Sequence, residues 1–210
     1  MNALASEMAR GRRPQKRAEE TRQRLLEAGI KGFAAQGFDG ATVVALEQAA
    51  GVQRGVLAYH FGTKDALWRA AIDHLFAMME RNVQAMAQAS RVLPDFDPLT
   101  VMVGGFIRFN AEHPELQRIV LHQSQHGGAR MDYLVEHHIR RLLIIVAGVS
   151  GHEMSVHDFY IYMGAVNAPF AWPYEGKAVW NVDTRSDEFL RQHTRLVVRI
   201  LRELWREPGR

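Results

Sequence analysis

The sequence predicts an all-α protein in which a small N-terminal unit precedes a larger helical domain. Apolar residues recur three and four positions apart through most of the 210 residues, which is the period of a helix with one buried face. No segment shows the strict alternation of apolar and polar residues that marks a half-buried strand. Capping residues, glycines and prolines divide the chain into separate helices.

Composition excludes several classes of protein. The chain has no cysteine, so disulfide bonds and thiolate metal sites are excluded. The longest apolar run, Leu142–Val149, has eight residues and is too short to span a bilayer. The N-terminal arginines are not followed by the apolar segment of a signal peptide. We therefore expect a cytoplasmic protein with no membrane partner.

Positive charge is concentrated at the N-terminal end. Residues 1–64 hold 10 of the 26 lysines and arginines but 6 of the 23 acidic residues. Such an excess suits phosphate binding, although ordinary solvated surfaces also carry runs of charge. Residues 1–15 are small, polar and basic, and we expect a disordered arm there. The basic side chains in and beside this arm either touch DNA or only aid solubility; they are Arg10, Arg12, Arg13, Lys16 and Arg17.

The first long helix is expected over about residues 16–36. Leu25, Leu26, Ile30 and Phe33 recur at helical spacing and give one face that must be buried. Gly37 fits the C-terminal end of this helix, where glycine is common.

The segment that follows predicts a helix-turn-helix. Thr42 is a suitable N-cap for a short helix over 43–50, and Gly51 permits a tight turn. A second helix, RGVLAYHF, is expected to begin at Arg54. In motifs of this kind the second helix lies in the major groove of DNA. Thr63 then caps a fourth helix over about 64–89.

Later start signals predict the remaining helices. Asp97 with Pro98 and His113 with Pro114 each suggest a cap followed by a first helical residue. Ser155 with an aspartate three residues on resembles a capping box. The expected helices are 98–111, 114–126, 129–149, 155–168 and a last one from 186 onward. The domains are then a basic arm (1–15), a helix-turn-helix domain (16–63) and a ligand-binding and dimerisation domain (64–210).

Residues 16–75 resemble the DNA-binding domain of the TetR/AcrR family of bacterial repressors. The remainder of the chain is similar in length and helical content only. The resemblance implies a homodimer that binds a palindromic operator in double-stranded DNA and is released by a small-molecule effector. It rests on residues that keep the family's spacing without gaps: Gly37, Phe38, Ala41, Thr42, Val43, Ala50, Gly51, Val52, Gly55, Leu57, His60, Phe61, Thr63, Lys64, Asp65, Ala66 and Leu67.

The motif residues have distinct expected roles at DNA. Gln53 can pair with adenine, and Arg54 can bind guanine through two hydrogen bonds or turn to a phosphate. Val56 offers a methyl surface to thymine, whereas Tyr59 and the residue after it are placed to reach phosphates. The start of the fourth helix is a candidate phosphate clamp. The expected DNA-binding set is Thr42, Gln53, Arg54, Gly55, Val56, Tyr59, His60 and Lys64.

Three positions depart from the family pattern. Ala58 stands where the family often has tyrosine, so that contact is lost or passes to Tyr59. Val44 stands where a polar or basic residue is common, which puts base contacts from the first motif helix in doubt. Glu47 replaces a small alanine, and we expect it to pair with a nearby arginine.

The last helix has an unusually wide apolar stripe. The resemblance implies that the last two helices of each subunit form a four-helix dimer interface. A stripe this wide suits that interface, and the alternative is burial within one subunit. Its members are Phe189, Leu190, Leu196, Val197, Ile200, Leu201, Leu204 and Trp205.

Aromatic residues with a few polar groups between 100 and 175 suggest a small-molecule pocket. Pro169 and Pro173 are expected to end a helix, which would hold neighbouring rings at a pocket rim. No charged cluster appears, so we expect an apolar or aromatic effector; the alternative for each residue is ordinary core. The candidates are Phe106, Phe109, His113, His122, Tyr160, Met163, Asn167, Phe170 and Trp172.

Histidine pairs and the absence of catalytic motifs bear on the alternative functions. His122 and His126 are four apart, as in some zinc or nickel sites, and His137 and His138 follow, so a metal-responsive regulator is one alternative. A DNA-binding protein without any ligand is another. No catalytic motif is present, since His152 and Glu153 lack the second histidine at the zinc-protease spacing. We expect no catalytic residues and no cofactor.

Overall fold

The computed structural model describes the backbone of residues 2–92 and 97–206, and the side chains of 15–86, 88 and 97–205. Every regular element in these ranges is helical, which confirms the predicted fold class. The chain divides into two compact units, residues 1–74 and 75–210. The side chains of Arg10, Arg12 and Arg13, assigned to a DNA-contacting arm, lie outside those described.

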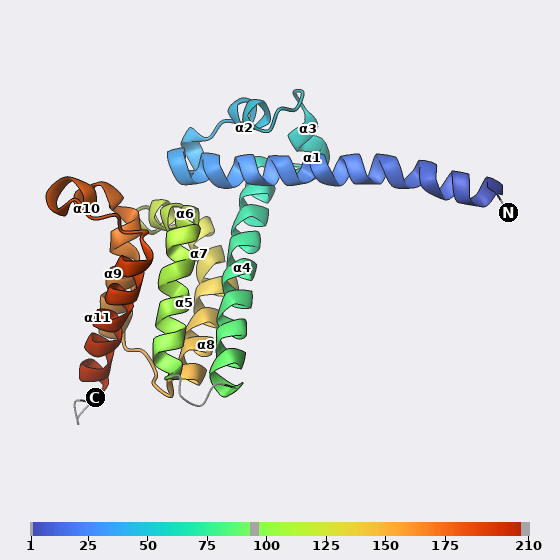
Figure 1. Ribbon diagram of the computed structural model, residues 1–210. Helices are drawn as coiled ribbons and strands as arrows, with labels where there is room; N and C mark the ends of the chain where they lie inside the picture. Colours follow the sequence, from blue (N-terminus) through green and yellow to red (C-terminus); the bar gives the residue numbers. More distant parts are fainter. Residues whose placement is uncertain (1, 93–96, 207–210) are drawn as a thin grey trace. The chain divides into compact units, whose positions relative to one another are not determined.

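The N-terminal unit contains α1 (Asn2–Gly40), α2 (Val43–Ala49), α3 (Val56–Phe61) and the start of α4 (Lys64–Val92). Figure 1 shows α2 and α3 on one side of the long α1. The structure differs from the expected disordered arm, because α1 is helical from Asn2 onward. Residues 2–15 include three alanines and three arginines, which favour helix, and a helix already formed extends at little cost.

The end of α1 is marked where the sequence predicts it. Gly37 has φ 69° and ψ 179°, which is open to glycine and costly for other residues. Thr42 caps α2, and its side-chain oxygen accepts a hydrogen bond from the amide of Ala45 at 3.2 Å.

Two glycines on α1 allow its neighbours to approach closely. A Cβ atom on Gly32 would lie 2.5 Å from a methyl carbon of Leu46 in α2, and one on Gly29 would lie 3.1 Å from Leu67 in α4. Leu46, Leu67 and Trp68 are almost fully buried. Because the first turns of α4 fill this core, the N-terminal unit extends to His74 and not to the predicted boundary at 63.

The C-terminal unit contains the second part of α4 and the helices that follow it. They are α5 (Pro98–Glu112), α6 (Pro114–Ser124), α7 (Ala129–Leu134), α8 (Arg140–Ser150), α9 (Val156–Ala171), α10 (Pro173–Trp180) and α11 (Asp187–Arg206). A π-helical turn, η1 (Val135–Ile139), joins α7 to α8, so the helix predicted over 129–149 is present with one wide turn. The predicted cap at Asp97 and the capping box of Ser155 and Asp158 are confirmed.

Helix α10 was not predicted. Pro169 lies inside α9, which continues to Ala171, and Pro173 occupies the first turn of α10. The prediction that the two prolines end one helix was therefore wrong for Pro169. Pro173 instead begins a helix, because its ring fixes a helical φ and its missing amide hydrogen is not needed at that position.

The packing of the C-terminal unit is centred on α5. Figure 1 shows α5 in the middle of the bundle, with α9 and α11 side by side. Val103, Phe106 and Ile107 of α5 are buried, and His193 of α11 contacts the carbonyl oxygen of Ala165 in α9 at 2.7 Å.

A buried carboxylate holds the two helices of the motif together. The Glu47 side chain of α2 is only 3% exposed, and its Oε1 accepts a hydrogen bond from the amide of Leu57 in α3 at 2.9 Å. Gly55, the N-cap of α3, offers no side-chain bond. Glu47 therefore replaces the missing cap, and the expected pairing with an arginine is not what the structure shows.

Replacing Glu47 should destabilise the N-terminal unit. We expect Glu47→Ala to lower the free energy of unfolding by about 1–3 kcal/mol, because a buried amide loses its acceptor. Glu47→Gln keeps an acceptor oxygen and should lose less. Urea unfolding followed by circular dichroism measures both, with exposed Glu19→Ala as the matched control. Equal stability of Glu47→Ala and the control would contradict the capping role.

Candidate nucleic-acid interface and ligand groove

The predicted recognition helix starts later than the sequence suggests. Gly55 has φ 87°, so α3 begins at Val56 and not at Arg54. The exposed side chains of Gln53 and Arg54 belong to the turn before the helix. A turn placed directly before a helix still presents its side chains at the helix N-terminus, where motifs of this kind contact base edges.

The exposed face of α3 includes most of the predicted contact residues. Tyr59 is 82% exposed, and its ring meets the edge of the His60 ring at 5.0 Å between centroids. Val56 and His60 are half-buried. Thr42 is exposed at the start of α2, although its side-chain oxygen is already engaged in capping.

Lys64 has a structural contact that the sequence did not indicate. Its Nζ donates a hydrogen bond to the carbonyl oxygen of Phe38 at 2.9 Å and lies 4.2 Å from the centroid of the Phe38 ring. The lysine thus ties the start of α4 to the end of α1. Its assignment to a phosphate clamp stays a prediction.

Two arginines of α1 also support the motif and were missed by sequence reasoning. Arg24 Nη1 donates to the carbonyl oxygen of Gly51 at 3.4 Å. The guanidinium carbon of Arg22 lies 4.8 Å from the centroid of the Phe61 ring. Both contacts join residues far apart in sequence, so local spacing offered no signal for them.

A family model of bacterial regulatory proteins, the tetR family, matches residues 25–71, which include the exposed turn and α3. Residues 25–71 thus form a TetR-family domain. The matched residues contain the core contacts of the N-terminal unit as well as its exposed face.

Relatives support the same assignment. The HTH-type transcriptional repressor NicS of Pseudomonas putida is 27% identical over 114 residues, which cover 53% of this chain and 51% of NicS. The HTH-type transcriptional regulator TtgR of the same species is 33% identical over 91 residues, covering 43% of this chain and 41% of TtgR. The chain therefore spans about half the length of the relatives it matches, or less.

The fold extends the likeness to the C-terminal unit. A TetR-like transcriptional regulator from Rhodococcus sp. RHA1 has a TM-score of 0.59 at 18% identity, covering 89% of this chain and 97% of that one. PfmR of Thermus thermophilus, also a TetR-family regulator, has a TM-score of 0.50 at 21% identity, covering 84% and 94%. At these identities the likeness shows a shared fold alone.

The predicted ligand residues differ in exposure. Phe106, Phe109 and Phe170 are buried, as the ordinary-core alternative expects. Tyr160 is largely exposed on α9, and Trp172 is 61% exposed between α9 and α10. The ring of His113 packs beside Phe109, and the Asn167 amide contacts the sulfur of Met163. The carbonyl oxygen of His122 contacts the ring of His126.

Three buried polar atoms of α5 and α9 have no hydrogen-bond partner within the described part of the chain. They are Asn110 Nδ2, the hydroxyl oxygen of Tyr162 and Asn167 Oδ1. Burial raises the pKa of the Tyr162 hydroxyl, so the group stays neutral. Such atoms cost free energy unless something else satisfies them.

Trp172 lines an open groove of about 720 Å³. We call this the α10 groove. It lies along the end of α9, α10, the start of α11 and the linker of residues 181–186 that joins α10 to α11. Sequence reasoning found only Trp172, because α10 itself was missed. The lining residues are Ala168, Pro169, Trp172, Glu175, Gly176, Trp180, Val182, Asp183, Thr184, Ser186, Glu188, Phe189 and Gln192.

Two other classes of site concern metal ions and membranes. No group of three or more histidine, aspartate or glutamate side chains in the described residues could hold a metal ion. His138 packs against the Phe76 ring at 4.3 Å and His137 against Tyr133. Within the same ranges no helix has the length and apolar character needed to cross a membrane.

Removing the unpartnered hydroxyl should stabilise the protein. We expect Tyr162→Phe to raise the free energy of unfolding by about 1 kcal/mol, because a buried oxygen without a partner is deleted while the ring stays. Tyr174→Phe, at a largely exposed tyrosine of α10, is the matched control. Thermal unfolding measures both, and a destabilised Tyr162→Phe protein would mean that the hydroxyl has a partner after all.

Proposed function

We propose that the protein is a homodimeric repressor whose α3 helices bind a palindromic operator. The observation that carries this proposal is the exposed turn with Gln53 and Arg54, held at the start of α3 inside a TetR-family domain. Two such helices would enter successive major grooves about one helical turn apart. A repressor of this kind would act in the cytoplasm, and the named functions of its relatives are regulatory and not enzymatic.

Arg54 should contribute to sequence recognition. We expect Arg54→Ala to weaken binding to the preferred operator by about 1–3 kcal/mol and to relax preference at one base position. Lys64→Ala should weaken binding to all sequences alike and also lower the melting temperature, because it contacts Phe38. Binding to a randomised operator pool, followed by sequencing, separates the two effects. Equal losses on operator and random DNA for Arg54→Ala would remove its base-reading role.

The dimer interface is proposed on α9 and α11. The apolar stripe of α11 divides, because Leu190, Val197 and Leu201 are buried while Leu196 and Ile200 are 46% and 45% exposed. Val156, Tyr160 and Ile161 of α9 are exposed too. Both helices thus keep an apolar face that one chain leaves uncovered, which is typical of a protein interface.

Charge on this face should prevent dimerisation. We expect Leu196→Glu and Ile200→Glu to give a folded monomer, because the side chains are half-exposed and a desolvated charge opposes association. Ile144→Glu, at an exposed apolar position on α8, is the control and should stay dimeric. Light scattering at micromolar concentration provides the measurement. An unchanged dimer in both α11 variants would place the interface elsewhere.

Release from DNA is proposed to follow the binding of a small apolar or aromatic effector to the C-terminal unit. The unpartnered Asn110, Tyr162 and Asn167 atoms support this idea, because an effector with polar groups would satisfy them. An effector can shift only an equilibrium between states that it binds differently. Helix α4 belongs to both units of the chain. A ligand-independent DNA-binding protein would show no rise in melting temperature with any member of a compound library.

A further inference from the structure

The α10 groove is lined mainly by aromatic and apolar side chains. Trp172, Trp180 and Phe189 border it together with Pro169 and Val182. Trp172 and Trp180 are 61% and 70% exposed, whereas tryptophan is usually well covered in folded proteins. A molecule in the groove would therefore remove a large apolar area from water.

The linker that forms one wall of the groove is fixed in place. Thr184 is buried, and its hydroxyl donates to the carbonyl oxygen of Pro169 at 3.0 Å. The amide of Val182 donates to the carbonyl oxygen of Gly176 at 3.0 Å. A Cβ atom on Gly176 would lie 2.9 Å from the Thr184 methyl, so only glycine lets the linker pack on α10 this closely. Contacts within the chain itself therefore hold this wall of the groove.

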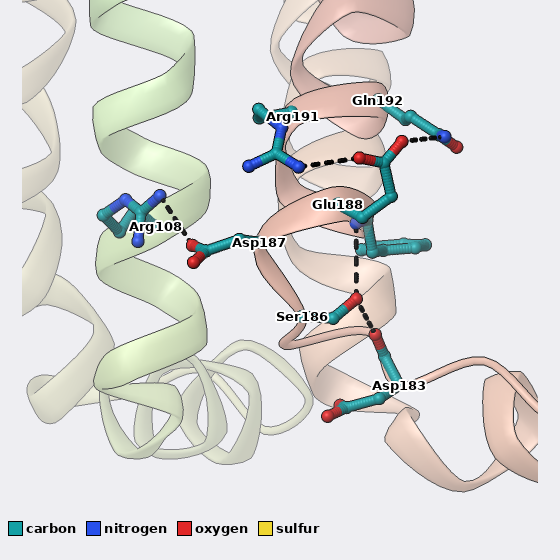
Figure 2. A network of polar contacts seen from close by, with 8 residues as sticks. Arg108, Asp183, Ser186, Asp187, Glu188, Arg191 and Gln192 are labelled. Carbon is teal, nitrogen blue, oxygen red and sulfur yellow. Dashed lines mark hydrogen bonds and ion pairs between the residues drawn. The ribbon is translucent and has the colours of Figure 1, made fainter.

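Negative charge distinguishes this groove from ordinary apolar surface. Glu175, Asp183 and Glu188 line it, and its described lining includes no lysine or arginine. Figure 2 shows Glu188 between Arg191 and Gln192. Arg191, followed by Gln192, holds the pKa of Glu188 below its ordinary value.

The carboxylates of Asp183 and Glu175 have fewer positively charged partners than that of Glu188. Asp183 Oδ1 accepts a hydrogen bond from the amide of Arg185 at 2.9 Å. Figure 2 shows Asp183 beside Ser186, and the Ser186 hydroxyl donates to the carbonyl oxygen of Asp183. Neither Asp183 nor Glu175 forms an ion pair with a described lysine or arginine. Arg108 pairs with Asp187 instead, at 3.1 Å. The groove therefore has two carboxylates that an incoming cation could neutralise.

We propose that the α10 groove binds an organic cation with a bulky aromatic or apolar body. Aromatic faces attract cations, and the unpaired carboxylates add attraction of the same sign. An anion of the same shape would meet the repulsion of Glu175 and Asp183. The site is separate from the buried α5–α9 region, and its binding can be measured without DNA.

Two ions of the same shape and opposite charge test the proposal. Tetraphenylphosphonium and tetraphenylborate are titrated separately into the full-length protein by calorimetry, with tryptophan fluorescence as a second signal. We expect the cation to bind at least roughly tenfold more tightly than the anion, as the charge of the groove requires. Trp180→Leu and Glu175→Gln should each weaken cation binding roughly tenfold, as expected for loss of one desolvated cation contact.

Matched variants keep the result specific to the groove. Tyr174→Leu removes an exposed ring of α10 that does not line the groove, and Glu153→Gln removes a carboxylate before α9 that also lies outside it. Both should bind the cation normally. Equal binding of the two ions, or equal affinity of all four variants, would overturn the proposal. A different result would be that Trp180→Leu dissociates a dimer while the unsubstituted protein does not bind the cation. A second copy of the chain would then occupy the groove, and the proposal would be overturned. A protein that binds the cation but no operator would contradict only the proposed function.

Discussion

The recognition helix α3 has six residues, and a helix of that length is unstable by itself in water. Its shape depends on contacts from the helices around it. Leu57 is buried in the core of the N-terminal unit, and its amide is bound by Glu47. Arg22 covers the Phe61 ring from α1. The exposed residues that precede and follow these anchors keep their positions because the buried side of the helix is held at both ends.

The C-terminal unit depends in a similar way on close approach to α5. A Cβ on Gly104 would lie 3.4 Å from a methyl of Thr194 in α11, and one on Gly105 would lie 3.0 Å from Met86 in α4. The two consecutive glycines let different helices pack against α5. Since α11 covers α5 with only part of its wide stripe, Leu196 and Ile200 remain outside. The stripe is thus buried within one chain at some positions, as one sequence alternative expects, and exposed at others.

Local signals in the sequence predicted most of the fold. Caps at Thr42, Asp97 and Ser155 each depend on residues three positions apart, so their chemistry is visible in the sequence. The start of α3 was misplaced because Gly55 was assumed to be helical, although glycine adopts a positive φ as readily as a negative one. Helix α10 was missed because a proline can end one helix or begin the next, and the choice depends on packing. The candidate site was harder to predict, because its contacts, such as that of Lys64 with Phe38, join residues distant in sequence.

The C-terminal unit departs from the usual distribution of polar and apolar groups in two opposite ways. Tyr162 and Asn167 of α9 bury polar atoms without described partners, whereas Trp172 and Trp180 leave large rings in water. Each arrangement costs free energy that an ordinary core or surface would avoid. Natural proteins retain such costs mainly where function requires them. Because α9 contains or adjoins both features, this helix is the element through which a bound molecule would most directly affect the packing of α5 and α11.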